Sequence, residues 1–168
     1  MIKRFFSLKA FIAALALAAC LSATAVAQQD LTFTTPDGQR VTLSGMRGKV
    51  TLLVFSSVED PQCRDLFKAL QSLSERYSGK DVNITWVSLD APGTVPNDRL
   101  RNPCGTAGSV IILRDQNRAA FKQFGGRQMP TIVILNREGQ VQGQPRGGFN
   151  PDSDFINNIA GIIDSLLK

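Results

Sequence analysis

Two cysteines, Cys63 and Cys104, are the residues of this chain best suited to chemistry. Cys63 follows a run of β-forming residues at 50–55 and a short polar turn. Asp60 suits a helix N-cap and Pro61 suits a first helical position, so we expect Cys63 in the first turn of a helix. A helix N-terminus favours a thiolate over a thiol. Strand, turn, helix and cysteine in this order are typical of a reactive-thiol site.

Each of these residues also has a plainer interpretation. Cys63 lies on the apolar stripe of the expected helix, where a small side chain packs into a core. Cys104 lies in a stretch rich in proline and glycine, where a cysteine can simply be a surface residue. The strands that precede the two cysteines should nevertheless end at the same edge of a sheet. A bridge between Cys63 and Cys104 is therefore within geometric reach.

The chain contains no histidine. This excludes Ser-His-Asp and Cys-His catalysis and the common histidine-containing zinc sites. Glu59 and Asp60 are adjacent carboxylates, but no further clustered ligands accompany them in the sequence. We therefore expect no metal and no cofactor.

Residues 1–27 have the pattern of an export signal, with basic residues before an apolar stretch that is short for a membrane span. The small residues before Gln28 predict cleavage at that point, which leaves a domain of residues 28–168 in the bacterial periplasm. The sequence that ends at Cys20 resembles a lipobox, and the alternative is a lipoprotein anchored through Cys20. Only that alternative predicts contact with a membrane.

Export changes the charge and the cysteine count. The leader holds three basic residues and no acidic ones, so its loss lowers the formal net charge from +5 to +2. A charge of this size, without a basic run, gives no reason to expect nucleic acid as a partner. Cys63 and Cys104 remain as the two thiols, in a compartment that permits disulfides.

The apolar patterns predict strands that alternate with helices in an α/β fold. A length of 168 residues with 43% hydrophobic content suffices for one domain with its own core. The expected strands are 31–35, 40–43, 50–55, 82–89, 110–113, 131–135 and 140–144, and the expected helices are 61–77, 118–124 and 151–167. The first two strands should form a hairpin, and residues 91–109 should be the least structured part. This order predicts a central mixed sheet flanked by helices on both faces.

With these elements in place, the chain resembles the thioredoxin-fold superfamily, in particular the exported redoxins or TlpA-like thiol-disulfide oxidoreductases. The resemblance covers nearly the whole mature chain and depends on the order and spacing of several short motifs. They are Pro36-Asp37-Gly38, Gly48-Lys49-Val50, Pro61-Gln62-Cys63-Arg64, Asp115, Met129-Pro130-Thr131 and Asn136-Arg137-Glu138-Gly139. The resemblance implies a thioredoxin-like fold with an N-terminal β-hairpin extension and a cis peptide bond before Pro130, facing Cys63.

The active site is degenerate with respect to this family. The family carries Cys-x-x-Cys, in which the first cysteine attacks a disulfide and the second resolves the mixed disulfide. Here the four positions read Asp60-Pro61-Gln62-Cys63, so the resolving cysteine is kept and an aspartate replaces the attacking one. The resemblance implies a substrate groove between this segment and Pro130, with binding residues Asp60, Pro61, Gln62, Met129, Pro130 and Thr131.

Three functions are consistent with these residues. The first is altered or residual thiol redox activity on a protein or peptide partner, with Cys63 as principal thiol and Cys104 as resolving partner. The second is a non-catalytic binding module that uses the groove between Asp60–Cys63 and Pro130. The third is a peroxidase-like redoxin, which ranks last because the Pro-x-x-x-Thr-x-x-Cys environment of peroxidatic cysteines is absent around Cys63.

Overall fold

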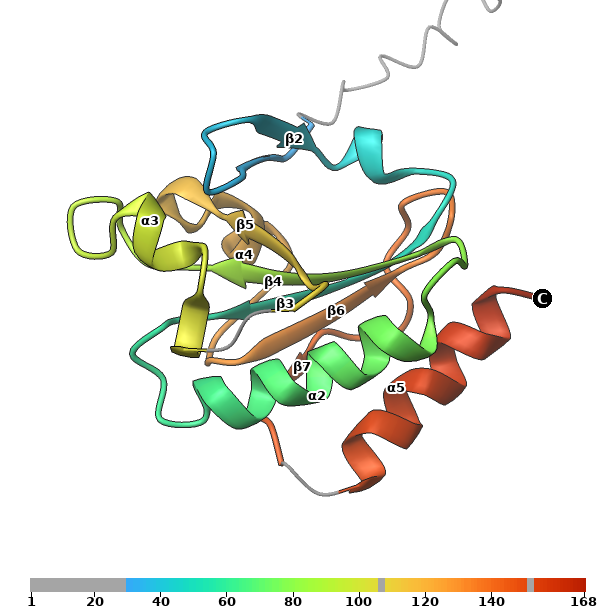
Figure 1. Cartoon of the computed structure of the whole chain (residues 1–168). Helices are drawn as coiled ribbons and strands as arrows, with labels where there is room; N and C mark the ends of the chain where they lie inside the picture. The colour runs from blue at the N-terminus through green and yellow to red at the C-terminus, as the bar shows by residue number, and fades with distance from the viewer. Residues whose placement is uncertain (1–29, 106–107, 151–152) are drawn as a thin grey trace, which may run out of the picture.

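The computed structural model describes residues 30–105, 108–150 and 153–168 and contains a seven-stranded sheet in the order β2-β1-β5-β4-β3-β6-β7 (Figure 1). The strands are β1 Thr32–Thr34, β2 Arg40–Thr42, β3 Val50–Ser56, β4 Val82–Ser88, β5 Ile111–Arg114, β6 Thr131–Leu135 and β7 Arg146–Gly147. The α-helices are α2 Cys63–Arg76, α3 Asn97–Leu100, α4 Ala119–Gln123 and α5 Ser153–Leu166. Short 3-10 helices are η2 Ser44–Met46, η3 Pro103–Gly105 and η4 Gln116–Arg118. The predicted leader, with Cys20 and the cleavage before Gln28, lies outside the described residues.

β3 is the central strand, and every residue in it is buried. It pairs in parallel with β4 and antiparallel with β6, while β4 pairs in parallel with β5. A strand covered on both faces needs a nearly continuous apolar run, which explains why Thr51 is the only polar residue in 50–55. The sheet is mixed, as the sequence predicted.

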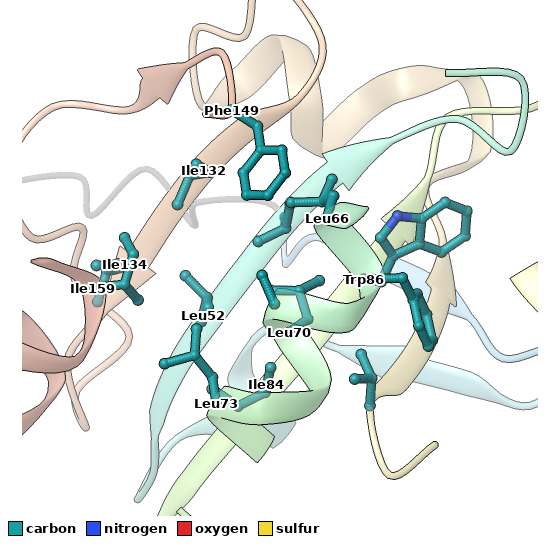
Figure 2. Packing of buried hydrophobic residues seen from close by; sticks show 14 of the residues in the cluster. Leu52, Leu66, Leu70, Leu73, Ile84, Trp86, Ile132, Ile134, Phe149 and Ile159 are labelled. Atoms are coloured by element: carbon teal, nitrogen blue, oxygen red, sulfur yellow. The ribbon is translucent and has the colours of Figure 1, made fainter. Parts of the chain in front are cut away.

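Helices cover both faces of the sheet. On one face, α2 and α5 close a core in which Leu66, Leu70 and Leu73 of α2 pack over the strands, as Figure 2 shows. On the other face, a second cluster joins Phe33 of β1 and Ala120 of α4 to the sheet. This is the thioredoxin-like arrangement that the sequence predicted. No helix among the described residues has the length and apolarity needed to cross a membrane.

The N-terminal hairpin is also confirmed. β1 and β2 pair antiparallel, with Phe33 opposite Val41, and β1 pairs with β5 through Thr34 and Arg114. The hairpin turn places Gly38 at a φ of 80°, a conformation that glycine adopts at no steric cost. The hairpin therefore extends the sheet beyond β5.

Two segments differ in detail from the sequence prediction. Within residues 91–105, part of the stretch predicted to be the least structured, short elements α3 and η3 form, and Val95 and Leu100 are fully buried. The expected strand at 140–144 reduces to a single bridge between Leu135 and Val141, and β7 forms further along the chain instead. Gly143 has a φ of 72°, which interrupts an extended strand between these two points.

Tyr77, the residue after α2, gives a test of the contact between α2 and α5. Its hydroxyl donates to the Asp164 carboxylate at 2.8 Å and lies 3.0 Å from the carbonyl oxygen of Ala160. Burial, with the nearby Asp164 carboxylate, raises the pKa of Tyr77 from 10.0 to about 12. The stability gained from the neutral hydroxyl is therefore fully present below pH 10 and is lost as the pH rises through 12.

We expect Tyr77→Phe to lower the free energy of unfolding at pH 7 by about 1–3 kcal/mol, because Asp164 loses a buried donor. The variant should also lose less stability than the parent protein between pH 10 and pH 12. Urea denaturation across this range measures both effects. Parallel pH profiles for the two proteins would contradict the assignment.

Candidate redox site

The site begins in the turn between β3 and α2. Cys63 is the first residue of α2 and is 4% exposed, with its side chain in the core beneath the helix. The N-cap is Gln62 rather than Asp60, which corrects the sequence prediction. Asp60 instead accepts a hydrogen bond from the Gln62 amide on its Oδ1 atom at 2.9 Å, while its carbonyl accepts from the Cys63 amide at 2.9 Å. The carboxylate thus stabilises the turn before the helix, so the helix starts two residues later than expected.

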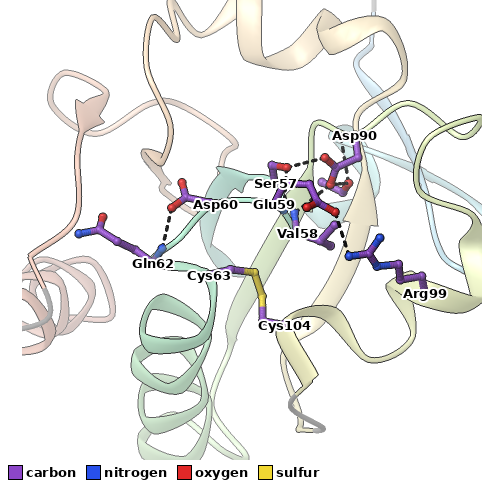
Figure 3. Close-up of a disulfide and its surroundings, with 10 residues drawn as sticks. Ser57, Val58, Glu59, Asp60, Gln62, Cys63, Asp90, Arg99 and Cys104 are labelled. Atoms are coloured by element: carbon purple, nitrogen blue, oxygen red, sulfur yellow. Dashed lines mark hydrogen bonds and ion pairs between the residues drawn. A yellow bond between two sulfur atoms is a disulfide. The ribbon is translucent and has the colours of Figure 1, made fainter.

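Cys104 reaches the same place from the segment after β4. It lies in η3 with φ 59° and ψ 13°, and it is half-buried between exposed Asn102 and Gly105. Cys63 and Cys104 form a disulfide across 41 residues of sequence, shown in Figure 3. Their Cα atoms are 5.6 Å apart, inside the usual disulfide range of about 4.4–6.8 Å. The structure therefore brings together the two thiols that the sequence singled out.

Asp90 connects the two segments that carry the cysteines. Its carboxylate accepts hydrogen bonds from the Ser57 hydroxyl at 2.5 Å and the Val58 amide at 3.0 Å, both in the turn before Cys63. It also accepts from the Ser88 hydroxyl at 2.9 Å, at the end of β4. Because Asp90 begins the segment that leads to Cys104, its carboxylate fixes that segment to the turn before Cys63. Figure 3 shows Asp90 beside Ser57 and Val58 of this turn.

Arg114, at the end of β5, is hydrogen-bonded to the segment that leads from β4 to Cys104. It is 2% exposed, and its guanidinium donates to the carbonyl oxygens of Asp90 at 2.5 Å and Val95 at 2.6 Å. It also donates to Oδ1 of Asn97 at 3.2 Å, in the first turn of α3. Burial lowers the pKa of Arg114, and the Asp90 carboxylate opposes that shift. These bonds fix residues 90–97, the first part of the segment that leads to Cys104, although the local sequence there predicts little structure.

Sequence reasoning missed both Asp90 and Arg114 as parts of the site. A signal was available for Arg114, since it directly follows the apolar residues 111–113 of a predicted buried strand. A buried arginine needs several acceptors, so such a position predicts a hydrogen-bonded cluster. No comparable local signal marks Asp90, because its partners lie in three separate segments.

An exposed ion pair spans the same two segments. Arg99 Nη2 lies 2.9 Å from Glu59 Oε1, with the side chains 54% and 63% exposed. Water and salt screen a pair this exposed, so it contributes little to stability. It does neutralise one arginine and one carboxylate near the disulfide.

A groove of about 390 Å³ opens beside the disulfide. Both sulfur-bearing residues line it, together with Val58, Asp60, Pro61, Arg64, Arg99, Asn102 and Gly105. The groove combines a carboxylate with two guanidinium groups and gives solvent and solutes a path to the bridge. Among the described residues, no group of three or more His, Cys, Asp or Glu side chains could hold a metal ion.

The Met129–Pro130 peptide bond is cis, and it precedes β6. Thr131 pairs with Phe55 near the end of β3, so Pro130 lies at the sheet edge from which the Cys63 turn departs. The Pro130 carbonyl accepts a hydrogen bond from the Gly148 amide at 2.9 Å, and Met129 is 41% exposed. The groove at the disulfide has no residue of 129–131 in its lining. Its second wall is the Cys104 segment.

A second groove, of about 450 Å³, lies beside Thr131, the first residue of β6. Thr131 lines it along with Gln128, Gly147 and five further residues, but no residue from the Asp60–Cys63 turn does. Neither of these two grooves joins the Asp60–Cys63 turn to Pro130, so the groove between those two segments stays a prediction.

The mixed sheet, the helix that starts at Cys63 and the cis-proline before β6 define a thioredoxin-like protein. A family model described as Redoxin matches residues 23–159, and the chain belongs to that family. No curated protein matches the chain in sequence.

Solved structures agree on the fold. A candidate thiol:disulfide interchange protein DsbE from Chlorobium tepidum superposes with a TM-score of 0.70 at 21% identity, over 83% of this chain and 94% of that one. The pneumococcal exposed lipoprotein thioredoxin Etrx1 from Streptococcus pneumoniae gives 0.67 at 18% identity, over 82% and 99%. A candidate thiol-disulfide oxidoreductase from Bacteroides vulgatus gives 0.67 at 21% identity, over 82% and 92%.

Proposed function

We propose that this chain is an exported thiol–disulfide oxidoreductase that cycles Cys63 and Cys104 between a disulfide and a dithiol. The observation that carries the proposal is the position of the bridge, which joins the first residue of α2 to η3 and lines an open groove. A purely structural bridge gains nothing from an open groove or from a helix N-terminus. A redox bridge needs both, since the groove admits the reactant and the helix stabilises the released thiolate.

The reaction conserves atoms and electrons. A substrate dithiol gives two electrons and two protons and becomes a disulfide, while the Cys63–Cys104 bridge takes the electrons and becomes a dithiol. The reverse direction reduces a substrate disulfide. No metal or cofactor is needed, because sulfur atoms exchange directly.

A protein or peptide is the proposed partner. Asp60 and Pro61 line the groove on the Cys63 side, and Gln62 follows them in the same turn. Met129, Pro130 and Thr131 lie along the same sheet edge. Exposed Met129 offers an apolar contact beside this edge. These residues are the proposed contacts for an extended segment that carries the substrate sulfur.

Export fits the same proposal. Cleavage before Gln28 would leave residues 28–168 as the mature domain, and an oxidising compartment maintains a disulfide. One structural neighbour is described as an exposed lipoprotein and another, from Mycobacterium tuberculosis, as a secreted disulfide oxidoreductase. Attachment through a lipid on Cys20 is the alternative to a free periplasmic protein.

The test is turnover with a disulfide substrate. We expect the purified mature protein to accelerate reduction of insulin disulfides by dithiothreitol, and both Cys63→Ser and Cys104→Ser to return the rate to background. Arg101→Met, which changes an exposed residue ion-paired with Asp37, is the matched control and should keep the activity. A parent protein no faster than Cys63→Ser would leave the binding-module function in place. Hydrogen peroxide consumption that depends on Cys63 alone would instead support the peroxidase-like function.

A further inference from the structure

We propose that Cys104 is the sulfur that exchanges with the substrate, and that Cys63 is the sulfur released as a thiolate. This inference rests on the proposed function and reverses the roles that the sequence assigned, where Cys63 was the principal thiol and Cys104 the resolving partner. In this assignment, the Cys104 thiolate, from the segment after β4, takes the role of the family's attacking cysteine, whose position Asp60 occupies here.

Access to the two sulfurs differs. Cys63 is 4% exposed and belongs to the core under α2, whereas Cys104 is half-buried and only packs against the edge of that core. The neighbours of Cys104 on the groove side, Asn102 and Gly105, are exposed. Both cysteines line the groove, but a thiolate must reach the sulfur that it attacks, so the greater exposure of Cys104 favours attack there.

The stability of the departing thiolate also favours attack at Cys104 and release of Cys63. Cys63 is the first residue of a 14-residue helix, and the partial positive charge at a helix N-terminus favours a thiolate. Cys104 lies in a three-residue 3-10 helix, which has no comparable dipole. A disulfide breaks faster when the departing sulfur forms the more stable thiolate. Departure of Cys63 is therefore favoured over departure of Cys104.

Charged side chains near Cys63 act on its thiolate in opposite directions. The Asp60 carboxylate opposes a nearby thiolate, but its Oδ1 atom is already hydrogen-bonded to the Gln62 amide. Arg64, the residue after Cys63, lines the groove and contributes a positive charge there. Arg99 lines it too, with its charge balanced by Glu59.

The two segments should stay together after the bridge opens. Asp90 holds the turn before Cys63, and Arg114 holds the segment before Cys104, through hydrogen bonds that do not involve either sulfur. The released Cys63 thiolate therefore remains beside Cys104, where it can attack the mixed disulfide in the reverse step. This is the arrangement that a resolving cysteine requires.

A substrate thiolate attacks Sγ of Cys104, a substrate–Cys104 disulfide forms, and the Cys63–Cys104 bond breaks with its electron pair on Cys63. A second substrate thiolate then attacks the substrate sulfur and releases the Cys104 thiolate. The substrate dithiol is oxidised, the protein disulfide is reduced, and the substrate's two protons pass to the protein thiolates through solvent.

The test maps the first adduct on the intact, oxidised protein. The probe is reduced glutathione, followed by a rapid quench with excess N-ethylmaleimide and peptide mass spectrometry. We expect glutathione on Cys104 and maleimide on Cys63. The product with glutathione on Cys63 and maleimide on Cys104 should be at least about tenfold rarer. In parallel, Cys63→Ser, which keeps Cys104, should take up glutathione from oxidised glutathione at least about tenfold faster than Cys104→Ser.

The outcomes separate the two proposals. Glutathione mainly on Cys63 would overturn the order of the sulfurs and leave the oxidoreductase function intact. No adduct on either cysteine, even at high glutathione, would mean that the bridge is a structural cross-link and would overturn both. Far-UV circular dichroism of the two serine variants shows whether each is folded, and the measurement on the parent protein does not depend on them.

Discussion

Replacing Arg114 with methionine is expected to lower the free energy of unfolding by about 3–5 kcal/mol. The substitution keeps much of the volume but removes every donor from a site that is 2% exposed. The carbonyl oxygens of Asp90 and Val95 would then be left without the partners they have at 2.5 and 2.6 Å. Each buried acceptor that loses its donor costs about 1–3 kcal/mol. Urea denaturation, monitored by the fluorescence of buried Trp86, measures the loss.

Arg101→Met serves as the matched control. Arg101 is 58% exposed and pairs with Asp37, so its loss should change stability by less than about 1 kcal/mol. Arg114→Lys keeps the charge but cannot direct two nitrogens to separate acceptors, and it should fall between the control and the methionine variant. An Arg114→Met protein as stable as the control would mean that the Cys104 segment is held by other contacts.

The same substitution should also mobilise the segment that carries Cys104. Hydrogen exchange of the amides in 91–105 should become faster relative to those of β3, because the bonds to Asp90, Val95 and Asn97 fix that segment to the sheet. This effect separates a positioning role from a loss of stability spread evenly over the domain, which would raise exchange in both places.

The contrast between Arg114 and β3 shows which parts of the fold a sequence can specify. The apolar run of β3, the helical stripe of α2 and the turn at Gly38 are local patterns, and the structure follows each of them. The segment 91–105 has no such pattern, since α3 is four residues long and its first residue is hydrogen-bonded to an arginine from β5. Its order comes from contacts between distant residues, which sequence periodicity does not encode.

The candidate site also has features that the sequence predicts and features that depend on the folded structure. Two thiols at one sheet edge could be deduced from the topology, because strands β3 and β4 are parallel and end together. The bond between Cys63 and Cys104 could not, since it depends on where η3 lies relative to α2. The N-cap shifted for a related reason: the Asp60 carboxylate bonds to the nearest free amide, that of Gln62, in a turn that forms before the helix begins.

Reducing the Cys63–Cys104 bridge is expected to lower the free energy of unfolding by roughly 3–4 kcal/mol, because the bridge closes a loop across 41 residues of the unfolded chain. Urea midpoints with and without a reductant measure this difference. Cys63→Ser and Cys104→Ser should each match the reduced parent protein and show no response to the reductant. Since a domain of this size has about 5–15 kcal/mol of stability, the reduced protein should remain folded.

This result also bears on the redox chemistry, because folding and disulfide formation are linked. If the bridge stabilises the fold by roughly 3–4 kcal/mol, then the fold favours the bridge by the same amount, or about 10²–10³ in its equilibrium constant relative to the unfolded chain. Asp90 and Arg114 would supply this preference by holding the two segments together in the dithiol form. A reduced protein that unfolds would show instead that the bridge is needed to hold the segments, and an oxidoreductase cycle through a folded dithiol would then be excluded.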